Sequence, residues 1–373
     1  MRFELSEEQA ELRAVVRSFL AEKSPEAAVR AAMAAEREYD PALWRQLSDQ
    51  LGLAALAVPE EYGGAGFSFV ELGVAVAEMG RALAVTPFLA SAVMSTTLLL
   101  AGGDEAAKRA YVPGLAGGEM IGTVALAEDS GSWTADAVTM RAEQRGAEWI
   151  LHGHKSFVLD LLAADVIFVV ARTDTGPAVF ALDATSDGVE RTALPVLDQT
   201  RRQGRLQCHD AVATLVGSTE DGWPAVQRML DLTAVALSAE MLGGAQRTLE
   251  MAVEYAKIRT QFGRVIGSFQ AIKHKCATVL VEIEAARSAV YYALWSAATG
   301  AADLPAVASL TKAFCSETYL LAAEENLQIH GGIGYTWEHP AHLYLKRAKH
   351  STLFLGGADF HRERLAQHVG IAG

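Results

Sequence analysis

The chain is poor in cysteine and in positive charge, and each shortage excludes a class of protein. Its three cysteines, Cys208, Cys276 and Cys315, are scattered and form no CxxC pair. We therefore expect reduced packing residues in a cytoplasmic protein, without metal or redox roles. Lysine and arginine number 32 against 45 acidic residues, and the net charge is −13. A nucleic-acid or membrane-surface partner would need a basic face, which this balance disfavours.

Long apolar stretches and familiar metal or phosphate motifs are missing too. Apolar runs such as Leu98–Ala101 and Val166–Ala171 are far too short to span a bilayer. The first residues, MRFELSEEQAEL, show no basic segment followed by an apolar one, so we expect no secretory leader. No HExxH, EF-hand or Walker motif occurs, and we predict no metal ion. Hydrophobic residues make up 51% of the 373, which is ample for a core.

Hydrophobic spacing divides the sequence into three segments. Up to about Gly117, apolar residues recur at spacings of three and four, which predicts helices, and Ser6 before two glutamates is typical of a helix start. From about Met120 to Trp223, short β-rich runs alternate with turn residues. From about Pro224 onward, helical periodicity returns in long alanine-rich stretches.

We therefore predict a mainly α protein with a central β domain. Its parts would be an N-terminal helical domain (1–119), a small β-barrel (120–222) and a C-terminal four-helix bundle (223–373). The expected strands lie in the runs Thr123–Leu126, Trp149–Leu151, Val166–Val170, Ala178–Leu182 and Val212–Val216. The expected bundle helices are roughly 224–262, 270–298 and 305–329, with a fourth from about 340.

Two motifs in the last segment carry residues suited to a phosphate-bearing cofactor. They are YAKIRTQFG (255–263), which continues as IGSFQ (266–270), and QIHGGIG (328–334). The guanidinium of Arg259 suits a pyrophosphate, and Phe262 offers a rigid apolar face. Hydrogen-bonding amides and close backbone approach would come from Gln270, Gln328, Gly331 and Gly332.

Each of these residues also has a plain structural explanation. Arg259 could be a surface cation near a helix end, and Gly331 with Gly332 could simply stop a helix. Taken together, in this spacing, the residues favour contact with a cofactor.

The motifs resemble the two signatures of the acyl-CoA dehydrogenase family, YAxxRxxFGxxIxxFQ and QxxGGxGY. Two upstream matches, PEEYGGAG (59–66) and WILHGHK (149–155), follow in the family's order, so the resemblance spans nearly the whole chain. It implies an FAD enzyme that dehydrogenates an acyl-CoA thioester and passes electrons to an electron-transfer flavoprotein. It also implies an ADP half-site for an FAD whose flavin lies in the neighbouring subunit, made of Arg259, Phe262, Gln270, Gln328, Gly331 and Gly332.

Against the family pattern, the chain lacks the carboxylate base that takes the proton beside the thioester. The family's Y-E-G-T stretch corresponds to FLGG (354–357), so Leu355 stands at the base position. Some members carry the base on the first bundle helix, and Thr233 stands there. Glu240 and Asp359 are the remaining candidate carboxylates, and for Glu240 we favour a surface or packing role.

The flavin side of the pattern is altered as well. Ala127 replaces the threonine of the family's V-T-E-P, and Leu159 replaces that of its W-I-T. Phe157, in place of the tryptophan, still offers a ring face. Ala234 replaces an arginine that usually follows the alternative base position. Losing the base and several flavin contacts together indicates a systematic change.

Four hypotheses follow. In the first, the chain is a subunit of a heterotetramer of the actinobacterial kind, acting on fatty-acyl or steroid side-chain thioesters and lending its ADP half-site to a homologous, base-bearing partner. The second is an active homotetramer that uses Glu240 or Asp359 as its base. The third is a flavin monooxygenase on the same fold, which needs no such base. The last, a purely structural protein, is disfavoured because Arg259 and Gln328 are retained.

Overall fold

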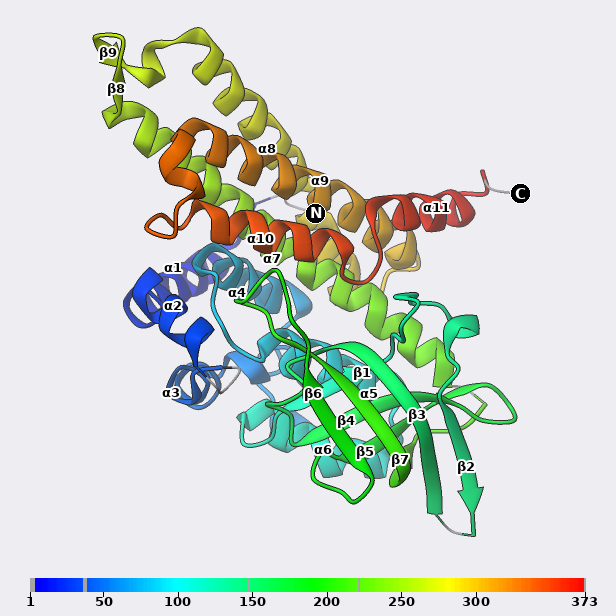
Figure 1. The fold of residues 1–373 in the computed structure, drawn as a ribbon. Coiled ribbons are helices and arrows are strands. Elements are labelled where there is room, and N and C mark those ends of the chain that lie inside the picture. The colour runs from blue at the N-terminus through cyan, green and yellow to red at the C-terminus, as the bar shows by residue number, and fades with distance from the viewer. Residues whose placement is uncertain (1–3, 36–38, 147, 221, 372–373) are drawn as a thin grey trace. The chain divides into compact units, whose positions relative to one another are not determined.

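The chain folds into two compact units, each assembled from separated segments (Figure 1). The computed structural model describes residues 4–35, 39–146, 148–220 and 222–371. Unit 1 comprises Met1–Arg30, Phe69–Ala84 and Ala234–Gly373, and unit 2 comprises Ala31–Ser68 and Val85–Thr233. The division into three domains at 119 and 222 stays a prediction. Within the described ranges, every helix is too short or too polar to cross a bilayer.

Unit 1 is a helical bundle. Its elements are α1 (Glu7–Lys23), α2 (Glu26–Ala34, which begins in this unit), α4 (Phe69–Ala82), α7 (Gly222–Ile258, which begins in unit 2), β8 (Thr260–Gln261), β9 (Arg264–Val265), η6 (Ile266–Ser268), α8 (Gln270–Thr299), α9 (Leu304–His330), η7 (Gly331–Tyr335), α10 (Ala341–Leu353) and α11 (Ala358–His368). The predicted helical C-terminal part is confirmed, with α11 as an addition.

Local sequence explains where α1 begins and how closely α4 and α7 pack. α1 starts with a capping box, in which Ser6 accepts a hydrogen bond from the backbone of Gln9 and Gln9 accepts one in return. α4 touches α7 backbone to backbone. A Cβ on Gly243 would lie 1.8 Å from the carbonyl oxygen of Ala77, so only glycine allows this approach.

Unit 2 joins short helices to a mixed sheet. The helical pieces are α3 (Pro41–Arg45), η1 (Gln46–Gln50), η2 (Leu53–Ala55), η3 (Glu60–Tyr62), η4 (Leu89–Ser95), α5 (Thr96–Gly102), α6 (Glu105–Gly117) and η5 (Ala135–Ala137). The strands are β1 (Gly122–Ala125), β2 (Arg141–Arg145), β3 (Glu148–Leu159), β4 (Val166–Arg172), β5 (Pro177–Asp183), β6 (Val189–Ala193) and β7 (Gln203–Val216).

The seven strands run in the order β1-β4-β2-β3-β7-β5, with β6 on β7 and a further pairing of β4 with β5. The predicted β domain is confirmed, but the predicted barrel is corrected to a mixed sheet. The strands do not close regularly, because β2 meets β4 through a single residue pair, Arg141 with Arg172. β1 adds a parallel edge on β4.

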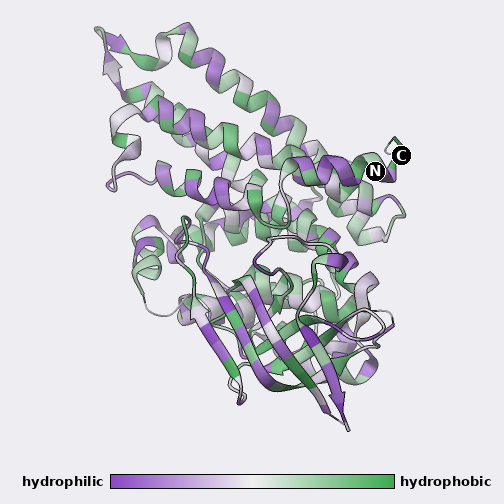
Figure 2. Ribbon diagram, turned by 45° about the vertical axis from the view of Figure 1, so that its right-hand side comes forward, coloured by the Kyte–Doolittle hydropathy of each residue, from purple (hydrophilic) through white to green (hydrophobic). Residues whose placement is uncertain are grey.

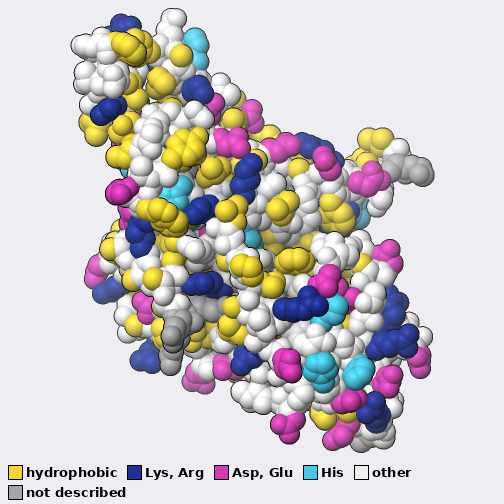
Figure 3. Space-filling view, viewed as in Figure 1, with side chains coloured by type: hydrophobic (Ala, Val, Ile, Leu, Met, Phe, Trp, Pro, Cys, Tyr) yellow, Lys and Arg dark blue, Asp and Glu magenta, His cyan; other side chains and the backbone are white. Residues whose placement is uncertain are grey.

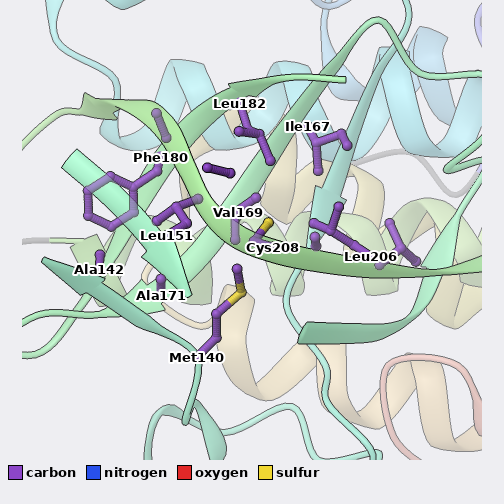
Figure 4. Packing of buried hydrophobic residues seen from close by; sticks show 14 of the residues in the cluster. Met140, Ala142, Leu151, Ile167, Val169, Ala171, Phe180, Leu182, Leu206 and Cys208 are labelled. Carbon is purple, nitrogen blue, oxygen red and sulfur yellow. The ribbon is translucent and has the colours of Figure 1, made fainter. Parts of the chain in front are cut away.

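The core of unit 2 lies between the strands. Side chains from β3, β4, β5 and β7 point toward one another there, among them Leu151, Val169, Phe180 and Leu206 (Figure 4). Hydrophilic and hydrophobic residues are mixed along the strands (Figure 2), as expected for a sheet with one buried face. β1 and β4 are exceptions, since all four residues of β1 and six of the seven residues of β4 are buried.

Candidate functional site

The hairpin that follows α7 presents two of the predicted cofactor residues. Its tip is Phe262-Gly263, and both residues have positive φ, 52° and 77°. A phenylalanine in this conformation is strained by about 1 kcal/mol, yet its side chain is 90% exposed. The backbone of Arg259 is fixed, because its N–H donates to Tyr255 and its carbonyl accepts from Ile266. An exposed, strained aromatic beside an anchored arginine is typical of a binding site.

The segments that carry the remaining residues meet around one small core. Ala252 and Ala256 of α7 pack with Ile329 of α9, and Ile272 and Cys276 of α8 join them. This cluster places the start of α8, the end of α9 and the hairpin at one end of the bundle. The ring of Tyr255 also stacks on His330, with centroids 4.3 Å apart.

At that end of the bundle the predicted residues face solvent. Gln270 opens α8 and Gln328 lies in the last turn of α9, and both are exposed. Gly331 needs glycine for its φ of 62°. A Cβ on Gly332 would meet nothing within 4 Å, so the chain itself leaves open space there. Hydrophobic, lysine and arginine side chains gather over β8 and β9, at the upper left of Figure 3.

Leu355, at the position predicted for the base, lies in the loop between α10 and α11. Leu355 is buried, 3% exposed, and has a φ of 64°, which is unusual for leucine. Its carbonyl accepts a hydrogen bond of 3.1 Å from Nε2 of His361. Burial lowers the pKa of His361 to about 3, so this ring stays neutral. An apolar side chain at this point cannot take a proton.

A buried lysine ties both ends of the same loop. Lys312 of α9 is fully buried, and its Nζ donates to the carbonyls of Gly356 at 3.2 Å and Thr352 at 3.5 Å and to Oγ of Ser316 at 3.1 Å. Burial lowers its pKa to about 7. Sequence reasoning missed Lys312, because a lone lysine inside a helix gives no signal of burial.

The other candidate base positions are occupied in ways that disfavour proton transfer. Oγ1 of Thr233 donates to the carbonyl of Met229, one turn earlier in its own helix. Oε1 of Glu240 accepts a 2.7 Å bond from Arg347 of α10, and both side chains are buried. Asp359 is fully exposed and bonds to a neighbouring arginine. The geometry favours the packing role for Glu240.

On the flavin side, the altered residues lie along β3 and the end of β1. Ala127 is buried, and its carbonyl accepts from the N–H of Ser156 at 2.8 Å. Phe157 sits in a β-bulge with a φ of 59° and is 39% exposed, so a ring face is available. Leu159 is buried, and its carbonyl accepts from Thr123.

A buried ion pair that the sequence analysis did not identify stabilises this region. Nζ of Lys155 donates to Oε1 of Glu128 at 2.8 Å and to the carbonyl of Leu126 at 2.9 Å. Burial opposes ionisation of Glu128, but hydrogen bonds from Lys155 and Met140 outweigh it and lower its pKa to about 2. Burial lowers the pKa of Lys155 to about 8. Both residues fall inside sequence matches noted above, which was the available signal.

Comparison with known proteins gives full-length matches. Two family models match, acyl-CoA dehydrogenase N-terminal domain over residues 6–119 and C-terminal domain over 220–370. Acyl-CoA dehydrogenase IpdE2 of Mycobacterium tuberculosis is 38% identical over 355 residues, 94% of this chain and 93% of the relative. The ChsE4–ChsE5 complex from Mycobacterium tuberculosis is 28% identical, with a TM-score of 0.91 over 100% of both chains. A variant of the Tcur3481–Tcur3483 steroid ACAD is 31% identical, with a TM-score of 0.89 over 98% of both.

Proposed function

This chain belongs to the acyl-CoA dehydrogenase family. We propose that it forms a heterotetramer and is the subunit without a catalytic base. It would lend its ADP half-site to the FAD of a homologous partner that carries the base. The observation that carries this proposal is Leu355, a buried apolar side chain at the base position. Hydrogen bonds from Lys312 to the carbonyl of Gly356 and from His361 to the carbonyl of Leu355 fix the backbone of this loop, and with it the position of Leu355.

FAD is the cofactor of the family, and the residues of this chain fit one half of it. Arg259 and Gln328 offer exposed donors for the pyrophosphate, Phe262 offers an apolar face, and the open space at Gly332 admits a group from outside the chain. The flavin half does not fit as well, because the side chain of Ala127 carries no hydroxyl. When bound, the flavin accepts the hydride from the substrate.

The tasks left to this chain are then binding and exclusion of water. Arg259 would hold a phosphate by a charge-assisted hydrogen bond, and the exposed ring of Phe262 would contact an apolar part of the cofactor. Leu355 keeps its surroundings dry and supplies no proton acceptor. Proton abstraction and the flavin pocket would belong to the partner.

Two of the matched structures support a heteromer and a substrate class. ChsE4–ChsE5 and Tcur3481–Tcur3483 each pair two differently named chains, and the second is called a steroid ACAD. We therefore propose a steroid-derived or fatty acyl-CoA thioester as substrate and an electron-transfer flavoprotein as acceptor. The three cysteines of this chain form no disulfide, which fits a reducing compartment, and we propose that the protein is cytoplasmic.

The test is to purify the chain alone and after co-expression with a homologue that carries the glutamate of the Y-E-G-T stretch. We expect the chain alone to be inactive, since a positioned base contributes about 10²–10⁴ in rate. The complex should be active and hold half as many FAD molecules as chains. Arg259→Ala should lower FAD affinity about tenfold or more. Full activity of the chain alone, with one FAD per chain, would support the homotetramer with a non-standard base instead.

A further inference from the structure

A cavity of about 420 Å³ lies inside unit 1, between α1, α2, α4, α7 and α10. Its volume falls in the range of small-molecule sites, about 300–1,000 Å³. None of the residues assigned above to FAD or to the base position lines it. The cavity is therefore separate from the site that the family resemblance implies.

Apolar side chains form most of its wall. They come from Leu20, Val29, Leu83, Met251 and Leu343. Leu83 is buried and has a positive φ of 49° just after the end of α4. The N–H of Ala84 bonds to Met79 and that of Leu83 to Gly80, which is a Schellman motif with leucine at the glycine position. The strain places an apolar side chain in the cavity wall.

Most charges around the cavity are already neutralised. Arg17 holds Glu78 with two hydrogen bonds, of 2.8 and 2.7 Å. Arg81 holds both carboxylate oxygens of Glu250. Glu26 pairs with an arginine of its own helix. These pairs leave neither a strong anion nor a strong cation to attract a ligand.

Arg247 is the exception. Its Nη1 reaches Glu250 only at 3.4 Å and Glu254 only at 3.5 Å, and Glu250 is already bound by Arg81. The guanidinium of Arg247 also makes a hydrogen bond with the side chain of Tyr344, which stays neutral because burial raises its pKa to about 12. The lining thus holds one guanidinium whose contacts with carboxylates are both long, at the edge of an apolar chamber.

We propose that this cavity binds a small aliphatic monocarboxylate. Its carboxylate would bind Arg247, and its tail would lie against Leu20, Leu83 and Met251. The single negative charge of a monocarboxylate matches the one guanidinium of Arg247. A more highly charged group such as a phosphate would also lie near Glu78 and Glu26, and the arginines paired with these glutamates are already engaged. The proposal is independent of the heterotetramer and adds a second binding site to the chain.

Octanoate is the probe, titrated into the purified chain by calorimetry, with octan-1-ol and octylamine as ligands of equal tail length. Octanoate should bind at least tenfold more tightly than either, because only it makes a charge-assisted hydrogen bond. Arg247→Gln should remove that advantage. Ala82→Phe, which fills the chamber and keeps Arg247, should abolish binding. Arg109→Gln, at a surface arginine paired with Glu105, is the matched control and should change nothing.

Three outcomes would overturn the site. Equal affinity for octanoate and octan-1-ol would remove the role of Arg247. Equal weakening by Arg247→Gln and Arg109→Gln would show unspecific attraction of the anion. Unchanged binding in Ala82→Phe would place octanoate elsewhere in the chain. Thermal unfolding of each variant shows whether it is folded, and Ala82→Leu replaces Ala82→Phe if the larger side chain prevents folding.

Discussion

Replacing Glu240 by glutamine removes the anionic partner of Arg347, and we expect a large loss of stability. The two side chains are 5% and 2% exposed, and their hydrogen bond measures 2.7 Å. Breaking a buried pair by removing one of its members costs about 3–5 kcal/mol. Replacing both, as Glu240→Leu with Arg347→Met, removes the charges together and should recover most of that loss.

Urea unfolding of Glu240→Leu, of Arg347→Met and of the double variant measures the coupling. The matched control is Glu324→Gln, which breaks an exposed pair with Lys349 and should cost at most about 1 kcal/mol. If Glu240→Gln is as stable as Glu324→Gln while the activity of the assembled enzyme falls, Glu240 acts on the substrate. The packing interpretation of the pair would then be wrong.

Three further outcomes are expected. Burial lowers the pKa of Lys312 from its ordinary 10.5 to about 7, so between these pH values the unfolded chain binds one proton more than the folded chain. The free energy of unfolding therefore rises with pH in this window, by up to about 1.4 kcal/mol per pH unit. Urea unfolding at several pH values should show a smaller rise in Lys312→Met. Gly243→Ala should lower the melting temperature despite a helix-propensity gain of about 1 kcal/mol, because its Cβ would clash with Ala77. Glu128→Gln should cost about 3 kcal/mol in urea unfolding, since Lys155 loses its counter-charge, and a cost below 1 kcal/mol would contradict the role of this buried pair.

The elements that could be predicted are those with a strong local signal. α8 ends just before Gly300 and α9 just before Gly331, because each of these glycines has a positive φ. The predicted runs of β-branched residues lie in β1, β3, β4, β5 and β7. β2 (RAEQR) and β6 (VERTA) were missed, because their residues are polar and mostly exposed and their pairing partners lie elsewhere in the chain.

Long-range packing could not be predicted. The grouping of residues 69–84 with the bundle depends on contacts such as that of Gly243 with Ala77, which the local pattern does not encode. The partner of Glu240 is equally invisible, since Arg347 lies more than a hundred residues away. The predicted cofactor residues Arg259, Phe262, Gln270 and Gln328 are exposed, and their role in binding stays a prediction.

The loop at Leu355 has two features that lower the stability of the folded chain and that folding alone does not require. Its backbone has a left-handed conformation that is unfavourable for leucine by about 1 kcal/mol. The loop also depends on the buried amine of Lys312. In the described part of the chain, the hydrogen-bond acceptors of this amine are one hydroxyl and two carbonyls. A chain selected only for stability would be better served by an apolar side chain at 312. A loop that keeps its shape while an apolar side chain stands at the predicted base position is what we expect of the proposed subunit, which would still have to fit a catalytic assembly.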